Sequence, residues 1–198
     1  MNINKYQLTS LTLALFFIVS CNYAPKQTAD SPSKIEKLEA YLFSIVDKKD
    51  TIQFIKVNTD LETPKPTILF LQGSLPIPLI IDYEDGYRHL VVFSNFDYKK
   101  IAEKYNLIII SMPFVPAIVP ESQLSKLSSY ITDKDIEYSH PIKYEENNYL
   151  DKYVERGEAV IQFLMQQKWV DNKHLIIFGH SQGSRVGTKI AAKNNRHS

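Results

Sequence analysis

Three short, almost uninterrupted apolar runs constrain the fold of this chain more than any other feature. They occupy residues 67–71 (TILFL), 107–112 (LIIISM) and 174–178 (HLIIF). Runs of this length and composition are typical of strands that are buried on both faces. Apolar spacing predicts helices over residues 96–105, from Asn147 or Asn148 to about 167, and from 181 to about 193. Strands joined by helices predict an α/β fold, with three layers around a largely parallel sheet.

The remaining segments of the body are less regular. Residues 35–46 have helical or mixed spacing, residues 51–58 (TIQFIKVN) resemble a strand, and residues 170–172 predict a turn. Residues 113–146 are too long for a simple connection, because most connections have about 4 to 6 residues. This segment is either a lid over a substrate pocket or an insertion that packs on the rim.

Composition and charge exclude several classes of protein. The chain has 198 residues, 23 Lys and Arg against 22 Asp and Glu, and a single Cys. The balanced charge gives no basic surface for nucleic acid. One Cys cannot form an internal disulfide, and no paired Cys and His spacing predicts a metal site. We therefore expect no cofactor, and a small molecule or a peptide as the substrate.

The N-terminus is typical of an export signal followed by a tether. Residues 1–20 contain a short polar start and a 13-residue apolar stretch, residues 8–20, that ends just before Cys21. A transmembrane helix is the alternative, but it needs about 20 apolar residues. The sequence Ile-Val-Ser-Cys resembles the lipobox of bacterial lipoproteins, which implies that Cys21 carries acyl chains such as palmitate. Residues 21–34 then form a flexible tether, and Asn22 favours the outer membrane over the inner one.

The motif Gly179-His180-Ser181-Gln182-Gly183 is the sharpest chemical signal. It follows an apolar strand and opens a helix, which is where a nucleophile elbow places a serine hydroxyl above the edge of a sheet. The backbone N–H of Gln182 at the helix N-terminus can donate to a developing oxyanion. The sequence therefore predicts Ser181 as a nucleophile and Gln182 as an oxyanion donor.

A second oxyanion donor is expected in the loop after an earlier strand. The run 67–71 is followed by Gln72-Gly73-Ser74, where Gly73 permits an unusual turn and the N–H of Ser74 can point inward. The alternative is a plain turn glycine without a catalytic role.

These motifs resemble those of the α/β-hydrolase superfamily, in its esterase- or peptidase-like members, over residues 67–195. The resemblance implies acyl transfer from Ser181, usually to water, within a hydrolase-like sandwich over residues 35–198. Gln72 stands where many members have His. The family order places the acid and then the His after the nucleophile, yet only fifteen residues follow Gly183 and only His197 among them is a histidine.

The triad acid and base are therefore not expected within this chain. His180 is expected to face away from the nucleophile, and His89, His140 and His174 lie upstream of it. A run as apolar as residues 174–178 belongs in the middle of a sheet, so we expect the domain to be incomplete on its C-terminal side, by about 60 to 120 residues.

Three functions remain open. The first is a serine hydrolase that cleaves an ester, thioester or peptide bond and that is inactive without its remaining triad residues. The second is a non-catalytic envelope protein that uses the scaffold for binding. The third is an acyltransferase, which would use the same nucleophile and the same oxyanion donors.

Overall fold

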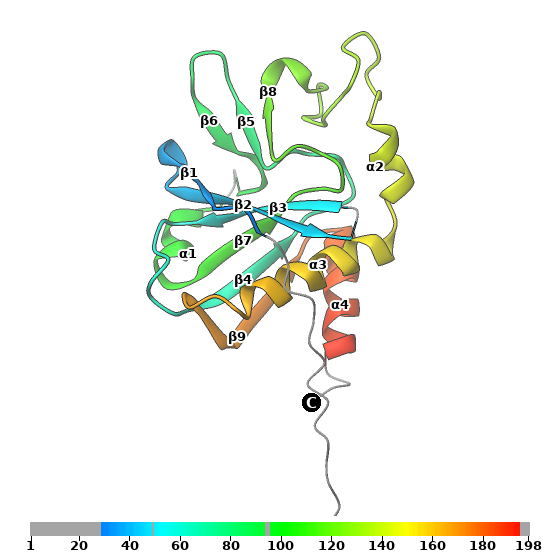
Figure 1. The fold of residues 1–198 in the computed structure, drawn as a ribbon. Coiled ribbons are helices and arrows are strands. Elements are labelled where there is room, and N and C mark those ends of the chain that lie inside the picture. The colour runs from blue at the N-terminus through cyan, green and yellow to red at the C-terminus, as the bar shows by residue number, and fades with distance from the viewer. Residues whose placement is uncertain (1–28, 49, 94–95, 195–198) are drawn as a thin grey trace, which may run out of the picture.

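The computed structural model describes residues 29–48, 50–93 and 96–194 (Figure 1). The predicted export signal, Cys21 and most of the tether lie outside the described residues. Within the described part of the chain, no helix is both long enough and apolar enough to cross a membrane.

A six-stranded sheet forms the centre of the molecule, with the order β1-β2-β3-β7-β4-β9. Its strands are β1 (Ser33–Ile35), β2 (Ala40–Asp47), β3 (Asp50–Val57), β7 (Asn106–Ile110), β4 (Lys65–Leu71) and β9 (Val170–Gly179). The apolar runs predicted as strands form β4, β7 and β9, which pair in parallel, whereas β1, β2, β3 and β7 pair antiparallel. The sheet is therefore mixed, with its parallel part next to the predicted elbow.

Helices cover both faces of this sheet and complete the three layers (Figure 1). Helices α3 (Leu150–Leu164) and α4 (Gln182–Asn194) lie on one face, and α1 (Tyr98–Lys104) lies on the other. The predicted short helix, long helix and elbow helix correspond to these three elements. A mixed α/β fold with a partly parallel sheet is thus confirmed.

A smaller layer lies above the carboxyl ends of the parallel strands (Figure 1). It contains the three-stranded sheet β6-β5-β8, made of β5 (Ile80–Asp82), β6 (Arg88–Leu90) and β8 (Ile118–Pro120), and helix α2 (Ile142–Asn147). Single 3-10 turns occur at Glu36–Leu38 (η1), Val91–Phe93 (η2) and Glu121–Gln123 (η3). The long segment 113–146 therefore carries β8, η3 and most of α2.

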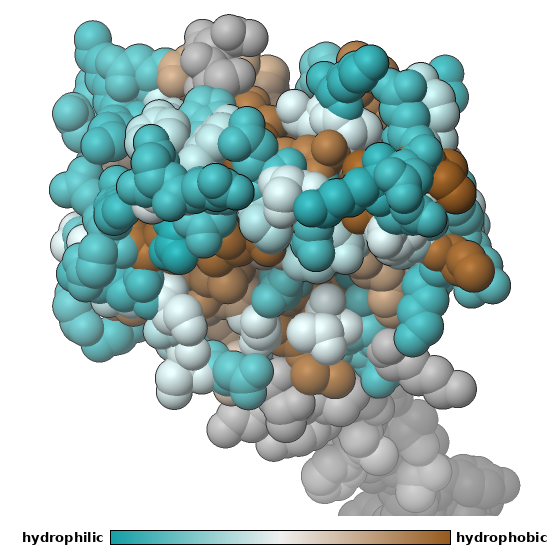
Figure 2. Space-filling view, turned by 90° about the horizontal axis from the view of Figure 1, so that it is seen from above, coloured by the Kyte–Doolittle hydropathy of each residue, from teal (hydrophilic) through white to brown (hydrophobic). Residues whose placement is uncertain are grey.

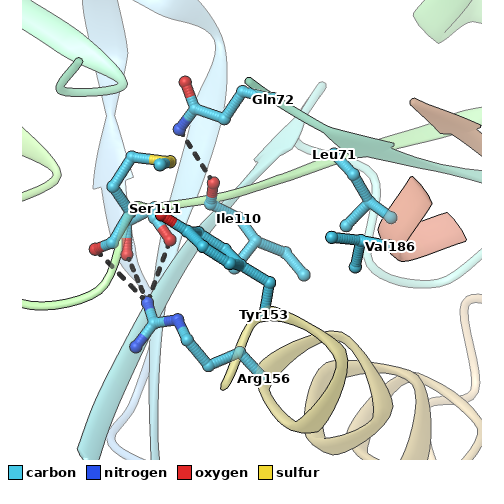
Figure 3. Close-up of a pocket in the computed structure, with 8 residues that line it drawn as sticks. Leu71, Gln72, Ile110, Ser111, Tyr153, Arg156 and Val186 are labelled. Atoms are coloured by element: carbon cyan, nitrogen blue, oxygen red, sulfur yellow. Dashed lines mark hydrogen bonds between the residues drawn. The ribbon is translucent and has the colours of Figure 1, made fainter. Parts of the chain in front are cut away.

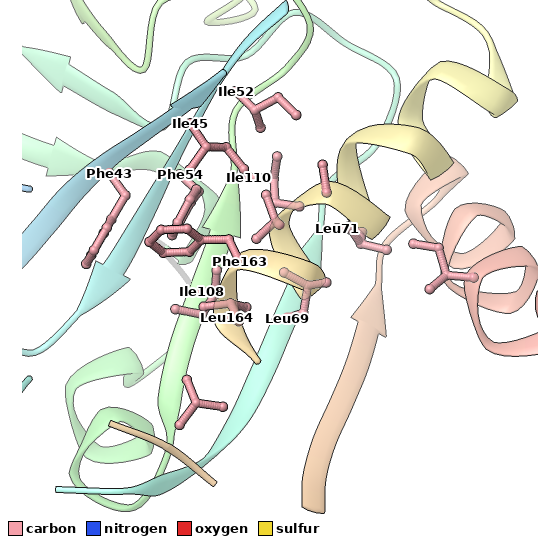
Figure 4. Packing of buried hydrophobic residues seen from close by; sticks show 14 of the residues in the cluster. Phe43, Ile45, Ile52, Phe54, Leu69, Leu71, Ile108, Ile110, Phe163 and Leu164 are labelled. Carbon is pink, nitrogen blue, oxygen red and sulfur yellow. The ribbon is translucent and has the colours of Figure 1, made fainter. Parts of the chain in front are cut away.

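The main core lies between the sheet and helices α3 and α4 (Figure 4). Phe43 and Phe54 stack with ring centroids 5.1 Å apart, and Phe163 of α3 meets both rings edge-on. Each fully buried side chain of this kind contributes about 1.5–3 kcal/mol. The core therefore fixes α3 across the strands whose carboxyl ends carry the site.

Three local predictions were wrong. Most of the segment 35–46, predicted as helical or mixed, is strand β2, because apolar side chains on both faces are buried and blur the alternation expected of a strand. Residues 170–172 belong to β9 rather than to a turn. Tyr149, and neither Asn147 nor Asn148, is the N-cap of α3, and the Asn148 side chain accepts a hydrogen bond from the Tyr153 hydroxyl instead.

Strand β9 is the outermost strand of the described sheet, although its apolar run is typical of a central strand. It pairs with β4 on one side only, and Ile176 and Phe178 are 46% and 50% exposed. Helix α4 covers the opposite face of the strand, where Ile177 lies against Gly187. One face and the outer edge of β9 are therefore open among the described residues.

Candidate active site

Ser181 occupies a strained turn between β9 and α4. Its φ is 53°, in the left-handed region that non-glycine residues rarely adopt. The turn is held by hydrogen bonds from the Gly183 N–H to the His180 carbonyl (2.8 Å) and from the Ser184 N–H and hydroxyl to the Ser181 carbonyl (3.1 and 2.6 Å). Such strain costs roughly 1–3 kcal/mol and is common at functional sites. The side chain is exposed at the predicted elbow.

The two glycines of the motif are required by close backbone approaches. A Cβ atom at Gly179 would lie 2.3 Å from the Gly183 carbonyl oxygen, and one at Gly183 would lie 2.0 Å from the Leu71 carbonyl oxygen. Both distances are shorter than any normal contact, and both involve backbone atoms that cannot rotate away. The sequence Gly-x-Ser-x-Gly thus allows α4 to begin directly against the end of β4.

The predicted oxyanion donors lie on both sides of Ser181. Gln182 is the first residue of α4, and the first N–H groups of a helix have no intrahelical acceptor. A Cβ atom at Gly73 would lie 3.4 Å from Ser181 Cβ and 3.8 Å from Ser181 Oγ. The loop of residues 72–77 after β4, called the β4 loop below, therefore passes directly beside Ser181.

The segment 113–146, with the end of β7, holds the β4 loop in place. Gln72 Nε2 donates to the Ile110 carbonyl (3.1 Å; Figure 3), and the Tyr130 N–H donates to the Pro76 carbonyl (2.9 Å). The hydroxyl of Tyr144, which is 1% exposed, donates to the Ser74 carbonyl. Burial, with a smaller effect of Tyr153, raises the pKa of Tyr144, so its phenol stays protonated and can donate. The segment therefore contacts the loop that carries the second predicted donor.

A cavity of about 400 Å³ opens beside Ser181. The β4 loop, the elbow and apolar side chains form its walls, among them Phe70, Phe96 and Phe178. From above, the molecular face around the smaller layer is mainly polar, with apolar side chains exposed in recesses between the polar ones (Figure 2). A mostly apolar cavity with a few polar groups is typical of a small-molecule site.

Among the described histidines, His180 is the one that lies beside Ser181. His180 lines the same cavity as Ser181, and its Nδ1 lies 3.8 Å from the Cβ position at Gly73, although we expected this side chain to face away. His174 pairs with Asp171 (2.7 Å), and His89 stacks on Tyr87. Within the described residues, Ser181 Oγ has no hydrogen-bond partner, so the structure brings no base to it there. His197 lies outside the described residues.

A pair between His140 and Glu145 was not predicted from the sequence. His140 Nδ1 lies 2.8 Å from Glu145 Oε1, and the ring packs edge-on against Tyr144. His140 Nε2 is buried without a hydrogen-bond partner in the described structure. His140 thus packs against Tyr144, whose hydroxyl contacts Ser74. Neither His140 nor Glu145 lines the Ser181 cavity.

A buried ionic cluster joins α3 to the start of β3 and to the residue that follows β7. This cluster was not predicted from the sequence either. Arg156 Nη1 lies 2.6 Å from Asp50 Oδ2, and Lys152 Nζ lies 2.9 Å from the same oxygen. Arg156 Nη2 donates to the Ser111 carbonyl (2.9 Å; Figure 3). Burial alone would raise the pKa of Asp50, but the charge and hydrogen bonds of Arg156 and Lys152 outweigh it and lower the pKa.

No cluster of three or more His, Cys, Asp or Glu side chains that could hold a metal ion occurs among the residues the structure describes. The described groups at this site are a hydroxyl at a strained turn, the N-terminus of α4, the β4 loop and an adjoining cavity. These groups suit attack on a carbonyl carbon and stabilisation of the resulting oxyanion.

Comparison with known proteins supports the fold. No protein-family model and no curated protein sequence matches this chain. A glucuronoyl esterase from Solibacter usitatus matches with a TM-score of 0.50 and 15% identity, over 87% of this chain and 50% of that chain. A second structure of a glucuronoyl esterase from this organism gives a TM-score of 0.51 and 16% identity, with the same coverage. The chain thus has the α/β-hydrolase fold and spans about half the length of the esterases it matches.

Proposed function

We propose that this chain carries the nucleophile half of a serine hydrolase that cleaves carboxylic esters or thioesters. The observation that carries the proposal is the position of Ser181, at φ 53° between β9 and α4 and beside Gly73. The fold is shared with esterases. Strained backbone of this kind is common at functional sites.

In the proposed reaction, Ser181 Oγ attacks the carbonyl carbon of the ester while its proton passes to a base. The carbonyl oxygen becomes an oxyanion that accepts hydrogen bonds from the N–H groups of Gln182 and Ser74. Collapse breaks the bond to the leaving group, which takes up the proton, and water then hydrolyses the acyl-serine. As in the α/β-hydrolase arrangement, we expect the acid and the His in sequence that follows α4.

Labelling with a fluorophosphonate tests the nucleophile directly. We expect the protein to be labelled when the acid and the His that follow α4 are in place, and we expect Ser181→Ala to abolish the label, since the phosphorus forms its bond to Oγ. Ser33→Ala is the matched control, because Ser33 is exposed in β1 at the opposite edge of the sheet. Mass spectrometry of the labelled peptide identifies the modified residue. Labelling that persists in Ser181→Ala would refute the assignment.

A non-catalytic binding protein is the second candidate, because no base reaches Ser181 Oγ among the described residues. It predicts a stable chain that no fluorophosphonate labels, even at high concentration. We also propose that the domain is anchored in the cell envelope through acylated Cys21. Incorporation of labelled palmitate, and its loss in Cys21→Ala, would check this anchor.

Removal of the Tyr144 hydroxyl should slow the reaction of Ser181. Tyr144→Phe keeps the buried ring but leaves the Ser74 carbonyl without its donor, so the β4 loop loses one of its attachments. We expect labelling to slow about three- to ten-fold, less than the roughly 10²-fold effect of losing an oxyanion donor itself. The free energy of unfolding should fall by about 1 kcal/mol.

Tyr130→Phe is the control for this prediction, because Tyr130 contacts the loop through its backbone N–H, which the substitution keeps. Its labelling rate should match that of the unmodified chain. Equal rates for Tyr144→Phe and Tyr130→Phe would show that the Tyr144 hydroxyl does not position the loop.

A further inference from the structure

Two consecutive backbone carbonyls at the end of β7 are held by side chains of two different elements (Figure 3). The Ile110 carbonyl accepts a hydrogen bond from Gln72 Nε2 at 3.1 Å. The next carbonyl, that of Ser111, accepts from Arg156 Nη2 at 2.9 Å. Gln72 belongs to the β4 loop, whereas Arg156 belongs to α3. The end of β7 therefore joins a helix of the main core to the loop that passes beside Ser181.

The Arg156 guanidinium is itself fixed in one orientation. It is 2% exposed, and its Nη1 lies 2.6 Å from Asp50 Oδ2, which Lys152 also contacts. Its Nη2 contacts the Ser111 hydroxyl (3.1 Å) as well as the Ser111 carbonyl. A planar guanidinium that is bonded through both of its terminal nitrogens cannot turn without breaking one of these bonds. Arg156 therefore fixes the peptide that carries the acceptor of Gln72.

The Gln72 side chain extends the link between β4 and β7 beyond the backbone ladder. The two strands pair in parallel as far as Phe70 and Ile109. After this point the chain of β4 leaves the sheet and becomes the β4 loop. The hydrogen bond from Gln72 to Ile110 is formed one residue further along β7. The first residue of the loop is thus still tied to the sheet.

Gly73 is the residue of the β4 loop that most needs such a tie. Glycine adopts a wide range of backbone angles, so the peptide that joins Gly73 to Ser74 can rotate unless both of its neighbours are anchored. Gln72 supplies one anchor, and the Tyr144 hydroxyl supplies the other at the Ser74 carbonyl. No acceptor takes the Ser74 N–H within the residues that the structure describes. The direction of this free donor therefore depends on the two anchors.

We propose that Gln72 is a positioning residue that fixes the direction of the Ser74 N–H, and that Arg156 acts on the site through Gln72. This inference rests on the proposed function, because it assigns the Ser74 N–H to the oxyanion. A donor stabilises an oxyanion strongly only when it is held in place beforehand. Loss of the Gln72 tie should therefore slow the formation of the bond to Ser181 and leave the binding of the reagent unchanged.

NMR relaxation of the backbone amides in the full chain tests the anchor without requiring any reaction. Gln72→Met keeps the length of the side chain but removes its donor. We expect the order parameters of the Gly73 and Ser74 amides to fall from about 0.85 to below about 0.6. Gln167→Met is the matched control, because Gln167 Nε2 also donates to a backbone carbonyl at 3.1 Å and does not line the Ser181 cavity. Unchanged order parameters in Gln72→Met would overturn the proposal.

A double variant tests whether Arg156 acts through Gln72. Arg156→Lys keeps a positive charge beside Asp50 but lacks the second nitrogen that holds the Ser111 carbonyl. We expect it to lower the order parameters of the β4 loop, and we expect Gln72→Met/Arg156→Lys to lower them no further than Gln72→Met alone. Urea unfolding should show a loss of stability from Arg156→Lys in both backgrounds. A further loss of order in the double variant would refute the link through Gln72.

Labelling kinetics of the protein that carries the acid and the His separate the two levels of inference. At saturating fluorophosphonate we expect Gln72→Met to react about ten-fold more slowly, which is less than the roughly 10²-fold effect of losing an oxyanion donor. The half-saturating concentration should not change, and Gln167→Met should react at the unmodified rate. An unmodified rate in Gln72→Met, with a mobile loop, would overturn the proposal. Absence of labelling from the unmodified protein would refute the serine hydrolase, whereas the order parameters would still decide whether Gln72 fixes the loop.

Discussion

Gly183→Ala is expected to lower the free energy of unfolding by about 3 kcal/mol or more and to abolish labelling of Ser181. An Ala in a helix normally stabilises it by about 0.5–1 kcal/mol relative to Gly. At this position the new Cβ would lie 2.0 Å from the Leu71 carbonyl oxygen and 2.7 Å from that of Gln72. Relief requires α4 to move away from β4, and overpacking of this kind costs about 1–3 kcal/mol or more.

Gly187→Ala provides the comparison within the same helix. Its Cβ would meet an Ile177 side-chain methyl at 2.9 Å rather than backbone, and the gain in helix propensity offsets part of the cost. Urea unfolding followed by circular dichroism should therefore show a much smaller change for Gly187→Ala. If Gly183→Ala were as stable as the unmodified chain, α4 would not begin against β4 as described.

The sequence predicted the elbow because every element of that signal is local. The strand, the turn at Ser181 and the helix are consecutive in the sequence. Gly179 and Gly183 indicate that neighbouring backbone comes close at these positions. The position of Gly73 was predictable for a related reason, since both loops follow adjacent parallel strands and parallel strands end at the same edge of the sheet. Local motifs and apolar periodicity were therefore sufficient to predict the positions of the elbow and of Gly73.

Interactions between distant residues were not predictable from one sequence. The hydrogen bond from Tyr144 to Ser74 spans 70 residues, and the ion pair of Arg156 with Asp50 spans 106. Neither position has a local feature that distinguishes a buried, paired group from an exposed one. Arg156 even lies in a helix whose polar residues would ordinarily face solvent.

The errors in secondary structure have a related physical cause. Strand β2 buries side chains on both faces, and its burial does not alternate with the period of two that identifies a strand. Residues 170–172 resemble a turn because Asp171 and Asn172 favour turns, yet Val170 pairs with Lys65 of β4 across a local shift in register. Pairing with β1 and β3 outweighed local preference in β2, whereas in β9 the pairing of Val170 with Lys65 continues the strand past residues 171–174, which have no partner in β4.

Arg156→Met is expected to destabilise the fold by about 3 kcal/mol, because the buried Asp50 carboxylate loses one of its two cationic partners and keeps only Lys152. Asp50 is 3% exposed and Arg156 is 2% exposed. Met matches the length of the Arg stem, so the loss should reflect charge and hydrogen bonding rather than a cavity. The substitution also removes the donor to the Ser111 carbonyl, next to the end of β7, where Ile110 accepts from Gln72 of the β4 loop.

The double variant Asp50→Asn/Arg156→Met distinguishes pairing from packing. Because Asn removes the buried negative charge, the double variant should be more stable than Arg156→Met alone. Additive losses from Arg156→Met and Asp50→Asn, measured by urea unfolding, would contradict a coupled pair.

The pH dependence of the free energy of unfolding should also reflect the ion pair of Asp50 with Arg156. The pKa of Asp50 is lowered in the folded chain, whereas an unfolded Asp titrates near 3.9. Its contribution to stability is therefore complete above about pH 5 and is lost as the pH falls through the lowered pKa of the folded state. Between pH 5 and pH 3 the free energy of unfolding of the unmodified chain should fall more steeply than that of Asp50→Asn/Arg156→Met. Parallel pH profiles for the two proteins would mean that Asp50 is not held ionised by Arg156 and Lys152.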